Sequence, residues 1–75
     1  MAFDYSKLRG RIIEKFGSIK AFSAAYGLSN VTMSNKLNGN VAISQDDIMK
    51  MSKPELLDIQ PEEIHEYFFT IKVHE

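Results

Sequence analysis

Apolar residues recur along the chain at intervals of three and four, the spacing that places them on one face of a helix. Capping residues, glycines and prolines interrupt this pattern where helices begin and end. N-cap candidates are Asp4, Ser18, Ser29 and Ser44, and Pro61 suits the first position of a last helix. The predicted helices cover residues 5–16, 19–26, 30–38, 45–52 and 61–67. The pattern therefore predicts an all-α fold, a compact five-helix bundle in a single domain over residues 1–75.

Two positions within these helices are open to alternatives. Gly10 either marks a close helix crossing or is tolerated at a cost of about 1 kcal/mol relative to Ala. In the fourth helix, Ile48 faces inward together with either Met49 or Met51.

The stretch over residues 18–39 has the pattern of a helix, a tight turn and a second helix. Gly27 lies between the two apolar runs, where a residue that adopts a positive φ is needed to end the first helix. Ser29 then caps the second helix, and Leu28 and Met33 have the spacing of a hydrophobic staple. Two short helices joined in this way form a helix-turn-helix unit, which presents its second helix to the major groove of DNA.

The helix over residues 30–38 has a small, polar face opposite its buried residues Met33 and Leu37. An Asn amide forms two hydrogen bonds with adenine, and a Val side chain contacts the methyl group of thymine. The candidate base-reading residues are Ser29, Asn30, Val31, Ser34 and Asn35. Basic and amide side chains nearby would contact phosphates and fix the register without reading sequence. The candidate phosphate-binding residues are Lys20, Lys36, Asn38, Arg9 and Arg11.

The tail over residues 67–75 alternates between apolar and polar positions with the period of a strand. One interpretation is a terminal segment that folds back and closes the core with Phe68 or Phe69. The other is a strand or arm that pairs with a second subunit. We favour the first, because a single edge strand in an otherwise helical domain lacks a partner within the chain. The residues of this candidate dimer or partner interface are Tyr67, Phe69, Ile71 and Val73.

Charge is divided unevenly along the chain, although the net charge is only −1. Residues 1–43 carry six basic and two acidic side chains, whereas residues 44–75 carry three basic and eight acidic ones. Such a division would present a weakly positive face to phosphates and an acidic part to another protein. Cysteine is absent, which excludes disulfides and cysteine-ligated metal sites. No apolar run reaches the about 18 residues of a membrane span and no signal peptide is visible, so we expect a cytoplasmic protein without a membrane partner.

The residue pattern does not support a catalytic or metal site. His65 and His74 are the only histidines, and neither belongs to a Ser-His-Asp pattern at useful spacing. His65 lies beside Glu62, Glu63 and Glu66, but such a group on a short surface helix is typically solvated. We therefore expect a protein that is not an enzyme and that holds no metal or cofactor.

The chain resembles the phage-repressor class of helix-turn-helix proteins, the group of the Cro and CI regulators, over FGSIKAFSAAYGLSNVTMSNKLNG. In that pattern a small residue stands four positions before the turn glycine, here Ser23, and an apolar residue follows the glycine, here Leu28. The opening YSKLRGRI and the closing PEEIHEYFF are similar to small proteins from phages and prophages of Gram-positive bacteria. Some of those act as Cro-like repressors, and at least one is a modulator of repression that binds its partner repressor. The resemblance implies a lambda-repressor-like bundle and a regulatory role in a phage or prophage.

Two functions are open at this point. The leading hypothesis is a transcriptional regulator that binds a double-stranded DNA operator, as a homodimer on a palindrome because one small unit contacts few base pairs. The alternative is an antirepressor, whose polar third helix or acidic C-terminal half docks on the basic DNA-reading face of a partner repressor. Gln, Arg or Lys commonly face the groove in the family that the chain resembles, and the small polar residues here favour the alternative.

Overall fold

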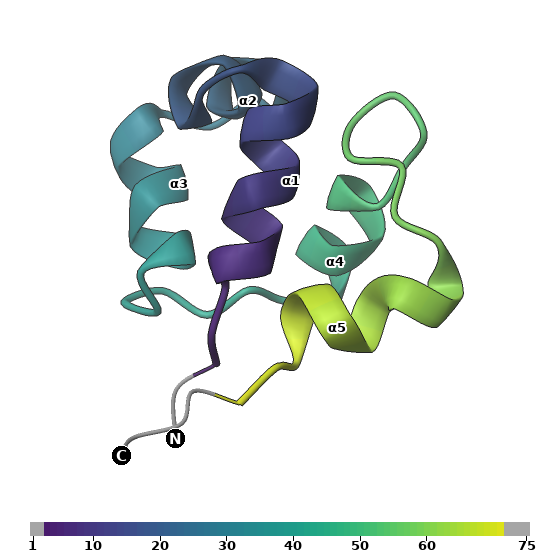
Figure 1. Cartoon of the computed structure of the whole chain (residues 1–75). Helices are drawn as coiled ribbons and strands as arrows, with labels where there is room; N and C mark the ends of the chain where they lie inside the picture. Colours follow the sequence, from purple (N-terminus) through teal and green to yellow (C-terminus); the bar gives the residue numbers. More distant parts are fainter. Residues whose placement is uncertain (1–2, 72–75) are drawn as a thin grey trace.

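The computed structural model describes residues 3–71 (Figure 1). Within this range, regular structure consists of five α-helices and one 3-10 helix, η1 (Pro61–Glu63). The α-helices are α1 (Ser6–Phe16), α2 (Ile19–Tyr26), α3 (Asn30–Leu37), α4 (Gln45–Met51) and α5 (Ile64–Phe68). The predicted all-α, five-helix fold is therefore confirmed. No helix within residues 3–71 is long and apolar enough to cross a bilayer.

The hydrophobic core forms where α1 packs against α2 and α5, and where α2 packs against α3. The buried apolar side chains are Leu8, Ile12, Phe22, Tyr26, Met33, Leu37, Ile48, Met51, Leu56, Leu57, Ile59, Tyr67 and Phe68. Met51 is fully buried whereas Met49 is 69% exposed, so Met51 is the inward-facing methionine of α4. A Cβ atom at Gly10 would meet open space, and Gly10 therefore does not mark a close helix crossing.

Three of the predicted N-caps are confirmed. The Ser18 hydroxyl accepts a hydrogen bond from the backbone N–H of Ala21 at 3.0 Å. Ser29 and Ser44 cap α3 and α4 in the same way, and Ser44 forms a reciprocal capping box with Asp47. Helix boundaries elsewhere agree with the prediction to within one residue, although the first turn of the last helix is 3-10 rather than α.

The start of α1 differs from the prediction, because the helix begins at Ser6 with Tyr5 rather than Asp4 in the N-cap position. The backbone N–H of Asp4 donates to the carbonyl of Thr70 at 2.7 Å, which holds Asp4 in the pairing of the two ends of the described chain. The Asp4 carboxylate still accepts a hydrogen bond from the backbone N–H of Ser6 at 2.8 Å. The Asp4 side chain therefore accepts a hydrogen bond from one of the N–H groups at the helix start, although Asp4 lies one residue before the N-cap position.

Gly27 forms the turn between α2 and α3 with a φ of 99°, in the left-handed region that the sequence analysis required. Its N–H and that of Leu28 both donate to the Ser23 carbonyl, at 2.9 and 3.0 Å. The Ser23 side chain is almost fully buried, and its hydroxyl donates to the Ile19 carbonyl at 2.7 Å. A small side chain such as that of Ser23 therefore fits in the buried last turn of α2.

The loop over residues 52–60, which separates the last two predicted helices, contributes three side chains to the core. Leu56, Leu57 and Ile59 are all buried, although they lie outside any helix. The Arg11 guanidinium on α1 donates to the carbonyls of Leu57 and Asp58, at 3.0 and 3.2 Å. Asp58 has a φ of 50°, a left-handed conformation that Asp tolerates better than most residues. Arg11 therefore anchors this loop to α1.

The described part of the tail, residues 67–71, folds back on its own chain, which agrees with the first of the two interpretations. Phe68 is 1% exposed in the core, whereas Phe69 is 39% exposed. Ile71 forms an isolated antiparallel bridge with Phe3, so the segment does have a pairing partner within the chain. The expectation that it lacks one was wrong, because the residues before α1 are extended and lie alongside it.

The four candidate interface residues of the tail are in three different situations. Tyr67 is 8% exposed, and it is a core residue rather than part of an accessible interface. Phe69 and Ile71 are exposed, at 39% and 54%. Val73 lies outside the described residues.

Candidate interface on helix α3

Helix α3 is oriented by the residues that it buries. Met33 is fully buried and Leu37 is 4% exposed, and both face the core as predicted. The helix packs against α2 across the turn at Gly27, and its opposite side is turned to solvent (Figure 1).

The solvent side of α3 carries four of the five candidate base-reading residues. Asn30 is exposed and Val31 is 69% exposed, while Ser34 and Asn35 are half-buried one turn further along. Helical spacing places these residues on one side of α3. We call this set, Asn30, Val31, Ser34 and Asn35, the α3 face.

Ser29, the fifth candidate, is engaged in capping. Its hydroxyl accepts from the backbone N–H of Thr32 at 3.1 Å and donates to the Thr32 hydroxyl at 2.8 Å. Because both hydrogen-bonding roles of the hydroxyl are used at the helix start, Ser29 supports α3 rather than extending the α3 face.

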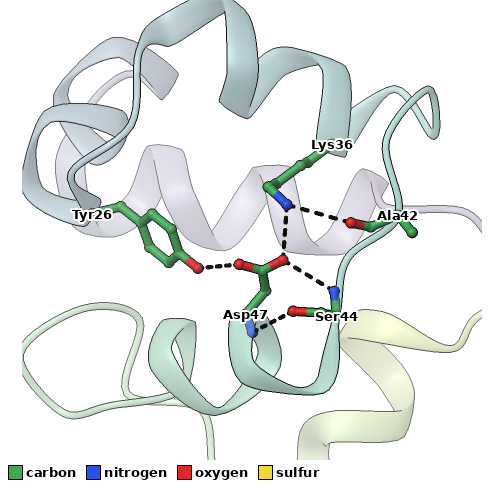
Figure 2. Close-up of polar contacts among 5 residues, drawn as sticks. All are labelled: Tyr26, Lys36, Ala42, Ser44 and Asp47. Carbon is green, nitrogen blue, oxygen red and sulfur yellow. Dashed lines mark hydrogen bonds and ion pairs between the residues drawn. The ribbon is translucent and has the colours of Figure 1, made fainter.

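Lys36, a predicted phosphate contact, lies on the side of α3 that faces α4 (Figure 2). Its ammonium nitrogen is 2.9 Å from Oδ2 of Asp47 and 3.4 Å from the Ala42 carbonyl oxygen. The Lys36 and Asp47 side chains are each only 14% exposed. Lys36 is therefore paired within the protein rather than presented to a ligand.

Asp47 receives hydrogen bonds from three sides. The Tyr26 hydroxyl on α2 donates to Oδ1, and the backbone N–H of Ser44 donates to Oδ2 at 3.0 Å (Figure 2). Burial alone would raise the pKa of Asp47, but the hydrogen bonds from Tyr26, Lys36 and Ser44 outweigh it and lower this pKa to about 2. Burial and the hydrogen bond to Asp47 raise the pKa of Tyr26. We call this group of four residues, Tyr26, Lys36, Ser44 and Asp47, the Asp47 clamp.

The clamp joins α2, α3 and α4 at one point (Figure 2). The ammonium group of Lys50 on α4 lies over the face of the Tyr26 ring, 4.2 Å from its centre. Sequence reasoning identified only the Ser44 cap at this point, and it missed the contacts of Asp47 with Tyr26 and Lys36.

The remaining phosphate candidates are dispersed. Arg11 is bound to the 52–60 loop and to Glu14, at 2.7 Å, on the α1 surface. The Arg9 guanidinium donates to the side-chain oxygen of Asn38, next to two shallow hollows that both residues line. Lys20 is exposed on α2, and it forms no ion pair or hydrogen bond through its side chain within residues 3–71. The structure therefore brings the amide and apolar candidates together, and of the four candidate cations it places only Arg9 beside them, in a hollow that Ser34 also lines.

No group of three or more His, Asp or Glu side chains in the described part of the chain is arranged to hold a metal ion. His65 packs near Phe69, with 6.3 Å between the ring centres. The side chains of the α3 face offer hydrogen bonding through two amides and the Ser34 hydroxyl, and apolar contact through Val31.

Comparison with known proteins identifies similarity along nearly the whole chain. The solution structure of the modulator of repression (MOR) of the temperate bacteriophage TP901-1 from Lactococcus lactis is similar, with 44% sequence identity and a TM-score of 0.80. The similarity covers 99% of this chain and 97% of that one, and that relative is a phage regulatory protein. A search of curated proteins gave no match. Residues 1–71 match the model of a family described as a protein of unknown function, DUF739, and the chain belongs to this family.

Proposed function

We propose that this protein modulates phage repression by binding a partner repressor through the α3 face. The observation that carries the proposal is the absence of an accessible cation on α3: its one basic residue, Lys36, is paired with Asp47. Most non-specific affinity for DNA comes from cations that neutralise phosphates. A surface of amides around the exposed Val31 suits a protein partner better.

Two further observations support a repressor as the partner. The similar phage TP901-1 protein is named a modulator of repression. In addition, eight of the ten acidic residues lie after residue 43, and a repressor domain that binds DNA carries basic groups for the phosphates. Opposite charges on the two partners would speed their encounter and orient it.

The proposal is tested by titrating the protein with the purified repressor from the same phage or prophage and measuring heat by calorimetry. Val31→Ser should weaken binding at least about fivefold, the effect of removing a contact worth roughly 1 kcal/mol. Met49→Ser is the matched control, because Met49 is also 69% exposed but lies on α4. Equal affinity of both variants and the parent protein would count against the α3 face, and no heat at all would count against a repressor as the partner.

Direct reading of duplex DNA by α3 is the second candidate function. It is favoured by the α2, Gly27 turn and α3 arrangement, which leaves Asn30 and Asn35 accessible for base edges. Here Asn35→Ala should lower affinity for an operator duplex at least several-fold. Its backbone carbonyl, which accepts from the N–H groups of Asn40 and Val41, is unaffected by the substitution. Promoter-selective binding that persists at near-physiological salt, with random duplex as the reference, would favour this function over repressor binding.

A further inference from the structure

The Asp47 clamp removes from solvent the only cation that α3 carries. Lys36 points across to α4, where Asp47 and the Ala42 carbonyl take two of the three hydrogen bonds that an ammonium group can donate (Figure 2). Asp47 is fixed in turn by the Tyr26 hydroxyl and the Ser44 N–H. The Asp47 carboxylate therefore already accepts a hydrogen bond that the Lys36 ammonium group could otherwise donate to a phosphate oxygen.

Moving Lys36 to a phosphate would be costly. The ion pair would break, and Asp47 would keep its charge at a site where its side chain is only 14% exposed. Removing one partner of such a pair leaves an uncompensated charge, which is strongly destabilising. A contact between Lys36 and a DNA phosphate would therefore have to contribute a favourable free energy larger than this cost.

We propose that Asp47 is a specificity-determining residue, which holds Lys36 away from the α3 face and so disfavours duplex DNA as a ligand. This inference rests on the proposed function, since it explains how a helix arranged to enter a groove selects a protein partner instead. It assigns to Asp47 a role beyond its capping box with Ser44. The amides and Val31 of the α3 face contact the partner. Asp47 neutralises Lys36, so that the surface around them carries no accessible positive charge from α3.

The first test compares Asp47→Asn with Asp46→Asn in binding to a random-sequence DNA duplex. Both variants lose one negative charge from the first turn of α4, but Asp46 is exposed and forms no ion pair within the described residues. An amide at position 47 can still accept the capping hydrogen bond, so the main change is the loss of the counter-charge to Lys36. Released from the clamp, Lys36 would reach the phosphates.

One additional phosphate contact steepens the dependence of log K on log salt by about 0.9. We therefore expect Asp47→Asn to bind duplex at least about threefold more tightly than Asp46→Asn at ~50 mM salt, with the difference lost near ~200 mM. The gain should vanish when Lys36→Gln is added to Asp47→Asn. Equal binding by the two single variants, or a gain that survives Lys36→Gln, would overturn the proposal.

A second measurement uses the unmodified protein and does not depend on whether a variant folds. Acetylation by a small amine-reactive reagent, followed by mass spectrometry, should modify Lys36 at least about tenfold more slowly than Lys20, which is exposed. Equal rates would show that Lys36 is accessible and would overturn the proposal. Neither experiment contains repressor, so failure of the proposed function, seen as absent repressor binding, is distinguishable from failure of this inference.

Discussion

Phe68 and Phe69 are adjacent in the sequence but occupy opposite environments, with exposed fractions of 1% and 39%. Phe68→Ala should lower the free energy of unfolding by about 3–5 kcal/mol, the range for deleting a buried aromatic ring. Phe69 meets the ring of Phe3 edge to face at 5.7 Å, so Phe69→Ala should cost only about 0.5–1.5 kcal/mol. Urea denaturation followed by circular dichroism measures both values, and similar losses would contradict this placement of the tail.

Arg11 should be important for stability rather than for DNA affinity. Its guanidinium donates to the carbonyls of Leu57 and Asp58, so Arg11→Ala should destabilise the fold by about 1–3 kcal/mol. Lys15→Ala, on the exposed side of the same helix, is the control and should change stability by less than about 0.5 kcal/mol. Urea denaturation checks both variants, and an Arg11→Ala protein as stable as the control would refute the anchoring role.

Gly10→Ala should stabilise the protein by about 1 kcal/mol, because Gly10 lies inside α1 and a Cβ atom there meets nothing within 4 Å. Gly27→Ala provides the contrast. Its φ of 99° is unfavourable for a residue with a Cβ atom, so the same substitution there should destabilise by roughly 1–2 kcal/mol. Thermal unfolding that moved in the same direction for both variants would be inconsistent with these backbone conformations.

Asp47 should make the stability sensitive to acid. Its pKa in the folded state is about 2, below the 3.8 of an unperturbed Asp, so the unfolded chain takes up this proton at a higher pH than the folded protein. Ionised Asp47 contributes about 2 kcal/mol to the free energy of unfolding above pH ~4, and this contribution is lost as the pH falls toward ~2. The stability difference between the parent protein and Asp47→Asn should shrink over this range in denaturation curves. A difference that stays constant with pH would exclude this linkage, and Asp46→Asn serves as the reference for general charge effects.

Helix positions were predictable because the signals that set them are local. A hydroxyl at Ser18, Ser29 or Ser44 reaches an N–H three residues away, and Gly27 alone permits the turn that follows α2. The one displaced helix start, at Ser6 rather than after Asp4, depends on a hydrogen bond between Asp4 and Thr70, far apart in the sequence. Local capping preference contains no information about such a contact.

The candidate site was less predictable, for the same reason. Helical spacing correctly placed Val31 on the side opposite Met33 and Leu37. It could not indicate that Lys36 would meet Asp47, because that pair depends on how α4 packs beside α3. A long, flexible lysine near a polar face was therefore interpreted as a phosphate contact, although a carboxylate from the next helix already neutralises it.

The bridge between Phe3 and Ile71 brings the first and last described residues to the same place. Between these two residues the backbone follows an almost complete ring, whose gap a linker of a few residues would span. Closing that gap in a cyclised version would restrict the unfolded chain far more than the folded one, and conformational entropy lost by the unfolded state favours folding. Cyclisation at this position would therefore stabilise the protein without a substitution in its core or on α3.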